Sequence, residues 1–334
     1  MTLRVVEKAK YAKRLLLAGG ALLVGVVAVL LATNQTPTSD IEATQTVATE
    51  PGVDGSPAAN SFEQTAVWGD GSDSIVFAGP NGLAVDGDGH VYSTEFQGGH
   101  LRKFSPEGVL EWEAGGAGSE PGLLSNAIGV AVAPDGVVYV SESGSSRVSR
   151  FDPDGTFRSA WGGPGNEPGQ FQSAMGIAVS DNSQVFVADF GNHRVQVFDR
   201  EGTYLRQWGQ PGSAPGEFAS PIGVQIGPAG NVWVVDSANE RVQVFSQDGE
   251  VIRVFDNVGS GPEIISLNDA GEFYVSSPWG DSQIRRFSPD GELLGLVADG
   301  LAGPHGSATG RSGVLYVADT MNGVIRTFSP SQAS

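Results

Sequence analysis

Three polar residues occupy equivalent places in a repeated pattern, namely Asn81, Glu263 and His305. Hydrolases, lyases and metal sites use residues of these types. Each directly precedes a marker column that recurs along the chain as Gly82, Gly129, Gly176, Gly223, Ile264 and Gly306. The other three units carry apolar residues at the same place, Ile128, Met175 and Ile222. A hydrolase or lyase centre around the three polar residues is therefore one hypothesis for the function.

The same residues make a poor metal site. Zinc needs three or four ligands, but this column offers one histidine and the chain contains no Cys. Calcium prefers six or more oxygen ligands, which three apolar neighbours cannot supply. The segment Asp86 to His90 looks like a fragment of a calcium loop, but it falls where the other units have a turn and lacks the closing Glu. We therefore predict no bound metal and no cofactor.

Composition excludes several other functions. The chain has no Gly-x-Ser-x-Gly elbow with suitably placed partners and no Gly-rich phosphate loop between a strand and a helix. After residue 32 it has 14 basic and 37 acidic residues, because five of the 19 basic and one of the 38 acidic residues lie earlier. Such a negative field repels nucleic acid. The absence of Cys excludes disulfides and Cys nucleophiles.

The stretch Val187 to Phe198 predicts a β-hairpin. A strand ends at Asp189, a tight turn follows, and an alternating strand runs from Arg194 to Phe198. Related stretches lie 47 residues upstream and downstream, and the marker column is spaced by 47, 47, 47, 41 and 42 residues. A period in the forties with strands throughout predicts a β-propeller.

The turn Asn192-His193 and the following Arg-Val-Gln-Val-Phe resemble the NHL repeat, a β-propeller blade motif. The amidating lyases that share this kind of propeller hold zinc through several histidines of the central channel. Because only His305 stands at such a position here, the resemblance does not extend to that site. Gluconolactonase-like propellers bind calcium in the channel, and Asn81 and Glu263 could contribute to such a site.

The number of strands predicts how the ring closes. Five units have a fourth strand, whereas the last unit has three strands and stops after Phe328. A lone strand at Gln64 to Gly69 resembles the fourth strand at Arg206 to Gly209. We therefore predict an all-β, six-bladed propeller over residues 62–330, with its last blade completed by the N-terminal strand and a short tail at 331–334.

One charged column predicts a structural role. Acids end three second strands and arginines start the third strands that follow, as Glu142 and Arg147, Asp189 and Arg194, and Asp236 and Arg241. Scaffold contacts repeat whereas functional sites are local, so we interpret these pairs as hydrogen-bonded clamps across the turn. His193, a turn residue of the repeat, has the same interpretation.

Aromatic residues predict a contact surface on one face. Phe96, Phe190 and Trp279 stand in loops between second and third strands, where other units have Ser or Thr. We expect these side chains, together with Asn81, Glu263 and His305, to form the candidate binding surface, with local packing as the alternative. Phe171 and Phe218 belong to Pro-Gly-x-Phe segments and are expected to pack between blades.

The N-terminal region predicts a membrane anchor. Residues 1–14 are a basic leader, and residues 15–32 are uncharged and long enough to cross a bilayer as a helix. The basic flank places the leader inside the cell and the propeller outside. A cleaved signal peptide, which would leave the propeller secreted, is the alternative. Residues 33–61 have the composition of a disordered linker.

These observations together predict a single-pass, membrane-anchored, extracytoplasmic propeller that acts as a ligand- or protein-binding platform. The partner is a protein or a small molecule, and nucleic acid is excluded. The alternative is a lactonase-like or amidating-lyase-like enzyme centred on Asn81, Glu263 and His305.

Overall fold

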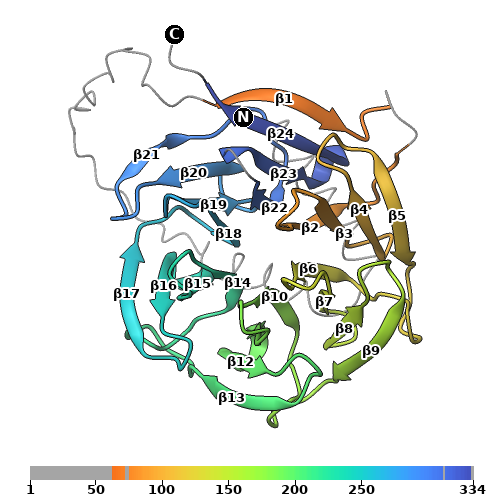
Figure 1. The fold of residues 1–334 in the computed structure, drawn as a ribbon. Helices are drawn as coiled ribbons and strands as arrows, with labels where there is room; N and C mark the ends of the chain where they lie inside the picture. The colour runs from red at the N-terminus through yellow and green to blue at the C-terminus, as the bar shows by residue number, and fades with distance from the viewer. Residues whose placement is uncertain (1–61, 72–74, 311–312, 332–334) are drawn as a thin grey trace, which may run out of the picture. The chain divides into compact units, whose positions relative to one another are not determined.

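The computed structural model describes residues 62–71, 75–310 and 313–331. These residues form six four-stranded antiparallel sheets arranged like the blades of a propeller around a central axis (Figure 1). The innermost strands are β2, β6, β10, β14, β18 and β22, and each contacts the innermost strands of its two neighbours. An all-β, six-bladed propeller is therefore the fold, as the sequence predicts.

Blades 1 to 3 follow one another along the chain. Blade 1 consists of β2 (Pro80–Val85), β3 (Val91–Glu95), β4 (His100–Phe104) and β5 (Leu110–Gly115). Blade 2 consists of β6 (Ala127–Val132), β7 (Val138–Glu142), β8 (Arg147–Phe151) and β9 (Phe157–Gly162). Blade 3 consists of β10 (Ala174–Val179), β11 (Val185–Asp189), β12 (Arg194–Phe198) and β13 (Tyr204–Trp208).

Blades 4 to 6 complete the ring. Blade 4 consists of β14 (Pro221–Ile226), β15 (Val232–Asp236), β16 (Arg241–Phe245) and β17 (Val251–Asp256). Blade 5 consists of β18 (Ile264–Leu267), β19 (Phe273–Ser277), β20 (Gln283–Phe287) and β21 (Leu293–Leu296). Blade 6 consists of β22 (Pro304–Thr309), β23 (Leu315–Asp319), β24 (Val324–Pro330) and β1 (Phe62–Trp68).

Blade 6 contains strands from both ends of the described chain. β1 pairs antiparallel with β24, from Phe62 opposite Pro330 to Trp68 opposite Ile325. The hydroxyl oxygens of Thr65 and Thr327 lie 2.9 Å apart across this pair. Every blade therefore has four strands.

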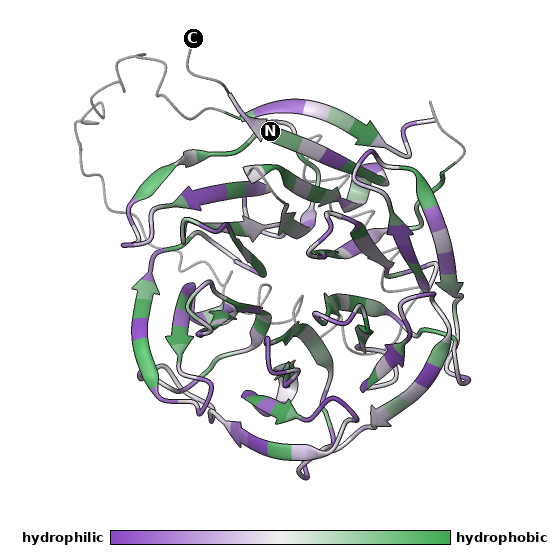
Figure 2. Cartoon of the chain, in the orientation of Figure 1, coloured by the Kyte–Doolittle hydropathy of each residue, from purple (hydrophilic) through white to green (hydrophobic). Residues whose placement is uncertain are grey.

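The apolar core lies between the blades. The second strand of each blade is almost wholly buried because it is covered on both faces by neighbouring sheets. The outer strands β9 and β13 instead alternate between exposed and partly buried residues. Figure 2 shows both hydrophilic and hydrophobic residues along these strands. Phe171 and Phe218 are fully buried, which confirms that they pack between blades.

The marker glycines allow adjacent inner strands to come close together. A Cβ atom on Gly176 would lie 2.3 Å from the carbonyl oxygen of Ile222, and one on Gly306 would lie 1.8 Å from that of Asn81. A side chain at these places would overlap the backbone of the next blade. Close packing of the inner strands therefore explains why glycine recurs in the marker column. Blade 5 is the exception, because it has Ile264 at this place.

The described residues contain no helix long and apolar enough to cross a membrane. The predicted leader 1–14, membrane span 15–32 and linker 33–61 lie outside the described residues, as does most of the tail at 331–334.

Candidate ligand-binding site at the channel mouth

The charged column forms a scaffold of hydrogen bonds in blade 3. Asp189 is fully buried, and its Oδ2 accepts hydrogen bonds from Arg194 Nε at 2.7 Å and Asn192 Nδ2 at 2.8 Å. Its Oδ1 accepts the backbone N–H of Gln172, 2.8 Å away in the loop between blades. Arg194 also donates to the carbonyl oxygens of Glu167 and Gln170. The clamp therefore ties the hairpin to the interblade loop.

The same arrangement holds in blades 2 and 4. Arg147 Nε lies 2.7 Å from Glu142, and Arg241 Nε lies 2.8 Å from Asp236. His193 closes its turn in the left-handed conformation with φ of 54°, and its Nδ1 accepts the N–H of Ser220 at 3.2 Å. These contacts join the hairpins to the loops between blades.

Sequence reasoning missed two clamps. Glu95 pairs with Arg102 in blade 1, and Asp319 pairs with Arg326 at 2.6 Å in blade 6. In both blades the arginine stands two residues later in the third strand, so it still projects from the same face of the sheet. Burial acts to raise the pKa of the Glu95 carboxyl, against the opposing effects of the N–H of Ala78 and the Arg102 guanidinium.

Blade 5 departs from the tethering that the other five blades share. In those blades, the residue after the acid donates its backbone N–H to the interblade loop, as Phe96 does to Gly79 and Phe190 does to Ser173. In blade 5 the acid is replaced by Ser277, and the next residue is Pro278, which has no N–H to donate. The turn that carries Trp279 therefore lacks both this backbone hydrogen bond and the acid that accepts a loop N–H in the other blades.

The residues before the marker column form a rim at one end of the channel, where the inner strands begin. Their order around the ring divides the rim into two arcs. Blades 5, 6 and 1 contribute the polar arc, Glu263, His305 and Asn81. Blades 2, 3 and 4 contribute the apolar arc, Ile128, Met175 and Ile222. Most of these residues are buried, and the rim is mixed in polarity.

Two residues of the polar arc interact directly. His305 Nδ1 lies 2.9 Å from Glu263 Oε2, and both side chains are close to 10% exposed, at 11% and 12%. The Trp279 ring packs edge-on against His305, with centroids 4.9 Å apart and an interplanar angle of 72°. The structure thus brings together Glu263, Trp279 and His305, three of the six candidate binding residues.

The other three candidates lie apart from this cluster. The backbone of Asn81 lies against Gly306, the residue after His305, but no interaction joins the Asn81 side chain to the pair among the described residues. Phe96 and Phe190 are half-buried in blades 1 and 3, where their loops are tethered.

One buried hydroxyl of blade 5 has no hydrogen-bond partner in the part of the chain that the structure describes. Ser276 is fully buried, and its Oγ forms no hydrogen bond within the described part of the chain. In blade 1 the equivalent Thr94 bridges the N–H of Gly82 and the carbonyl oxygen of Ile128 in the next blade, each at 2.9 Å. The backbone of Ser276 adjoins that of Glu263, whose N–H donates to the Ser276 carbonyl oxygen.

The described residues contain no group of three or more His, Cys, Asp or Glu side chains that could hold a metal ion. An imidazole and a carboxylate at hydrogen-bond distance can share or transfer a proton.

Comparison with known proteins gives a family and a fold. The NHL repeat matches residues 124–151, 171–198 and 218–245, which fall in blades 2, 3 and 4. Comparison with curated protein sequences gives no match.

Several solved structures share the fold at low identity. A streptogramin B lyase is 16% identical with a TM-score of 0.59, over 81% of this chain and 98% of that chain. A gluconolactonase from Xanthomonas campestris is 14% identical with a TM-score of 0.60, over 77% and 87%. A chain of a nidogen–laminin complex is 16% identical with a TM-score of 0.54, over 66% and 80%. At these identities the similarity shows the fold alone, and together with the three matched repeats it makes this chain an NHL-repeat six-bladed β-propeller.

Proposed function

We propose that the protein is a membrane-anchored, extracytoplasmic propeller that binds a small molecule or a protein segment at the channel mouth. The observation that carries this proposal is the buried Glu263–His305 pair beneath Trp279. Glu263 and Trp279 belong to blade 5, the blade that lacks the shared tethers, and a local departure from a repeat points to a site because scaffold contacts recur.

The two arcs of the rim indicate which chemical groups a ligand would carry. An apolar group would contact Ile128 and Met175, and a hydrogen-bonding group would reach Glu263 and His305 on the opposite side of the ring. Ligand sites commonly combine an apolar lining with a few such polar groups. Nucleic acid is disfavoured because acidic residues outnumber basic residues 38 to 19 in the whole chain.

A fragment screen tests the binding function. Ligand-observed NMR on the full-length chain would identify fragments that bind, and His305→Gln would remove the imidazole from the pair. His100→Gln is the matched control, since His100 lies in blade 1 with its side chain 31% exposed. We expect fragments whose binding is lost in H305Q and retained in H100Q. A screen in which no bound fragment responds to His305→Gln contradicts the proposed site.

The anchoring has its support in the sequence of residues 1–32, where a basic leader precedes eighteen uncharged residues. We expect the full-length chain to remain in the membrane fraction after alkaline washing and a chain that starts at residue 33 to be released. A mature N-terminus beyond residue 32, read by mass spectrometry, would show a cleaved signal peptide and a secreted propeller instead.

A channel-centred hydrolase or lyase is the second candidate, and the geometry of the pair favours it. When His305 Nδ1 donates to Glu263, its Nε2 is free to accept a proton from a substrate, as in a general base oriented by a carboxylate. Asn81 would complete the polar arc around the reacting group.

Turnover separates the two candidates. The names of the lyase and the gluconolactonase suggest a streptogramin B antibiotic and a gluconolactone as test substrates for the full-length chain. Turnover that His305→Gln abolishes would favour the enzyme, as would stoichiometric zinc or calcium that survives dialysis. Fragment binding at His305 without turnover of either substrate would favour the binding platform.

A further inference from the structure

A cavity of about 670 Å³ lies at the opposite end of the channel, where the inner strands end. All six blades line it, and neither Glu263 nor His305 belongs to its lining. Its volume is in the range of small-molecule sites. The cavity is therefore separate from the candidate site at the other mouth.

Backbone groups form much of the cavity wall. Each inner strand pairs on one side only, with the second strand of its own blade. In an antiparallel pair, alternate residues direct their N–H and C=O groups away from the partner strand. The N–H of Asp86 donates to His90 and that of Gly227 donates to Asn231, so Val85 and Ile226 direct their backbone groups into the channel. The wall thus presents both donors and acceptors.

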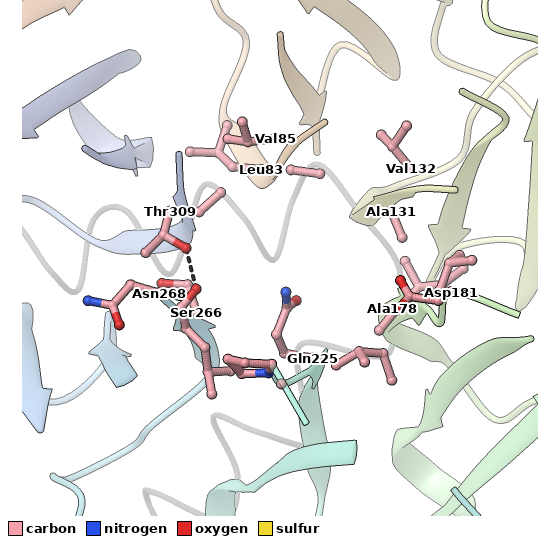
Figure 3. Close-up of a pocket in the computed structure, with 18 of the residues that line it drawn as sticks. Leu83, Val85, Ala131, Val132, Ala178, Asp181, Gln225, Ser266, Asn268 and Thr309 are labelled. Atoms are coloured by element: carbon pink, nitrogen blue, oxygen red, sulfur yellow. Dashed lines mark hydrogen bonds between the residues drawn. The ribbon is translucent and has the colours of Figure 1, made fainter. Parts of the chain in front are cut away.

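One side chain adds a free amide to this wall. At its register position four blades have Ala and blade 5 has Ser266, whereas blade 4 has Gln225. Figure 3 shows Gln225 projecting into the cavity, and within the described residues its amide has no hydrogen-bond partner. An amide offers two N–H donors and one oxygen acceptor. Other polar groups are already engaged, since Ser266 Oγ bonds Ser307 Oγ at 2.9 Å and Thr309 Oγ1 bonds the Leu267 carbonyl.

Charge at the mouth restricts the ligand further. Asp181 and Asp269 are exposed lining residues, and none of the described lining residues is Lys or Arg. These carboxylates would repel an anion. The N–H donors of the wall carry partial positive charge and would disfavour a bare cation. Hydroxyl groups both donate and accept, so they suit a wall of mixed donors and acceptors.

We propose that this cavity binds a neutral polyhydroxylated molecule, such as a monosaccharide or a cyclic polyol. Its hydroxyls form hydrogen bonds with the inward backbone groups of the inner strands and with the Gln225 amide, and they donate to the Asp181 and Asp269 carboxylates. The proposal does not depend on the function of the Glu263–His305 pair at the other mouth.

Amide chemical shifts of the isotope-labelled full-length chain test the proposal residue by residue. We expect glucose or myo-inositol to shift the amides of Val85, Val179 and Ile226 in a saturable way and to leave Ile128 and Met175 unchanged. Gluconate, which is similar in size but negatively charged, should shift them less. Gln225→Leu should weaken binding by about two- to tenfold, the usual weight of one hydrogen bond.

The control is Gln210→Leu, the same change at an exposed site in the loop between blades 3 and 4, which should leave binding unchanged. Water alone in the cavity would give no saturable shift with either polyol and would overturn the proposal. Binding that a folded Q225L variant leaves unchanged, or equal binding of gluconate, would also overturn it. If Gln225→Leu prevents folding, the shift map of the unaltered chain decides by itself.

Discussion

At the scale of single residues, the clearest contrast is between repeated clamps and the local cluster at His305. The clamp acids Asp189 and Asp236 are fully buried, and each accepts hydrogen bonds from an arginine and from the interblade loop. Removing the arginine would leave a buried carboxylate without its partner, and this lowers the free energy of unfolding by more than the hydrogen bond itself contributes. The clamps therefore stabilise the fold, and we expect their removal to be measurable in unfolding experiments.

Arg194→Ala should lower the free energy of unfolding by about 1–3 kcal/mol, the cost of leaving a buried charged group without its partner. Arg253→Ala is the control, because Arg253 is 49% exposed and its pair with Asp290 lies in solvent. That change should have little effect. Urea denaturation of the unaltered chain and of the two variants provides the measurement. Arg194→Ala should also leave fragment binding at the channel mouth intact, and lost binding with an unchanged denaturation curve would make Arg194 a site residue.

At the scale of elements, contact between inner strands depends on the marker glycines. Gly176→Ala would place a Cβ atom 2.3 Å from the Ile222 carbonyl oxygen, so the two strands would have to separate. We expect destabilisation of about 1–3 kcal/mol, typical of overpacking in a core. Gly87→Ala is the control because no atom lies within 4 Å of its Cβ position. Equal urea midpoints for the two variants would show that the inner strands are not closely packed.

At the scale of the whole molecule, the pairing of β1 with β24 leads to a prediction about ring closure. Deleting residues 62–69 would remove the fourth strand of blade 6 and expose the edge of β24. We expect insolubility or a large fall in melting temperature. Deleting residues 33–60 should leave the melting temperature unchanged. Identical melting of both deletions and the full chain would mean that β1 does not hold the ring.

Charge also acts on the whole molecule. The formal net charge is −19, and self-repulsion of an acidic surface weakens the compact state at low ionic strength. We expect the melting temperature to rise as monovalent salt increases to about 1 M, where the screening length is roughly 3 Å. Screening predicts most of the rise at low concentration and a similar effect of chloride and sulfate, whereas stronger apolar burial predicts a larger effect of sulfate. A flat or falling melting temperature would argue against repulsion.

The amino-acid sequence determined the repeat, the strands and the number of blades. The spacing of the marker column, the turn residues around Asn192 and the alternation of Arg194 to Phe198 are local signals, because turn geometry and strand periodicity depend on near neighbours. Clamps whose arginine directly starts the third strand were predictable for the same reason. The clamps at Arg102 and Arg326 were missed because their arginines stand two residues further along the same face.

Only the tertiary structure decided which polar residues meet. Glu263 and His305 are 42 residues apart and belong to different blades, so their contact depends on how the inner strands pack around the ring. Trp279 reaches His305 from the preceding blade, whereas Phe96 and Phe190 stay in tethered loops. Gln225 was likewise unremarkable in the sequence, because a channel wall exists only once six inner strands surround a common axis and turn their unpaired edges towards it.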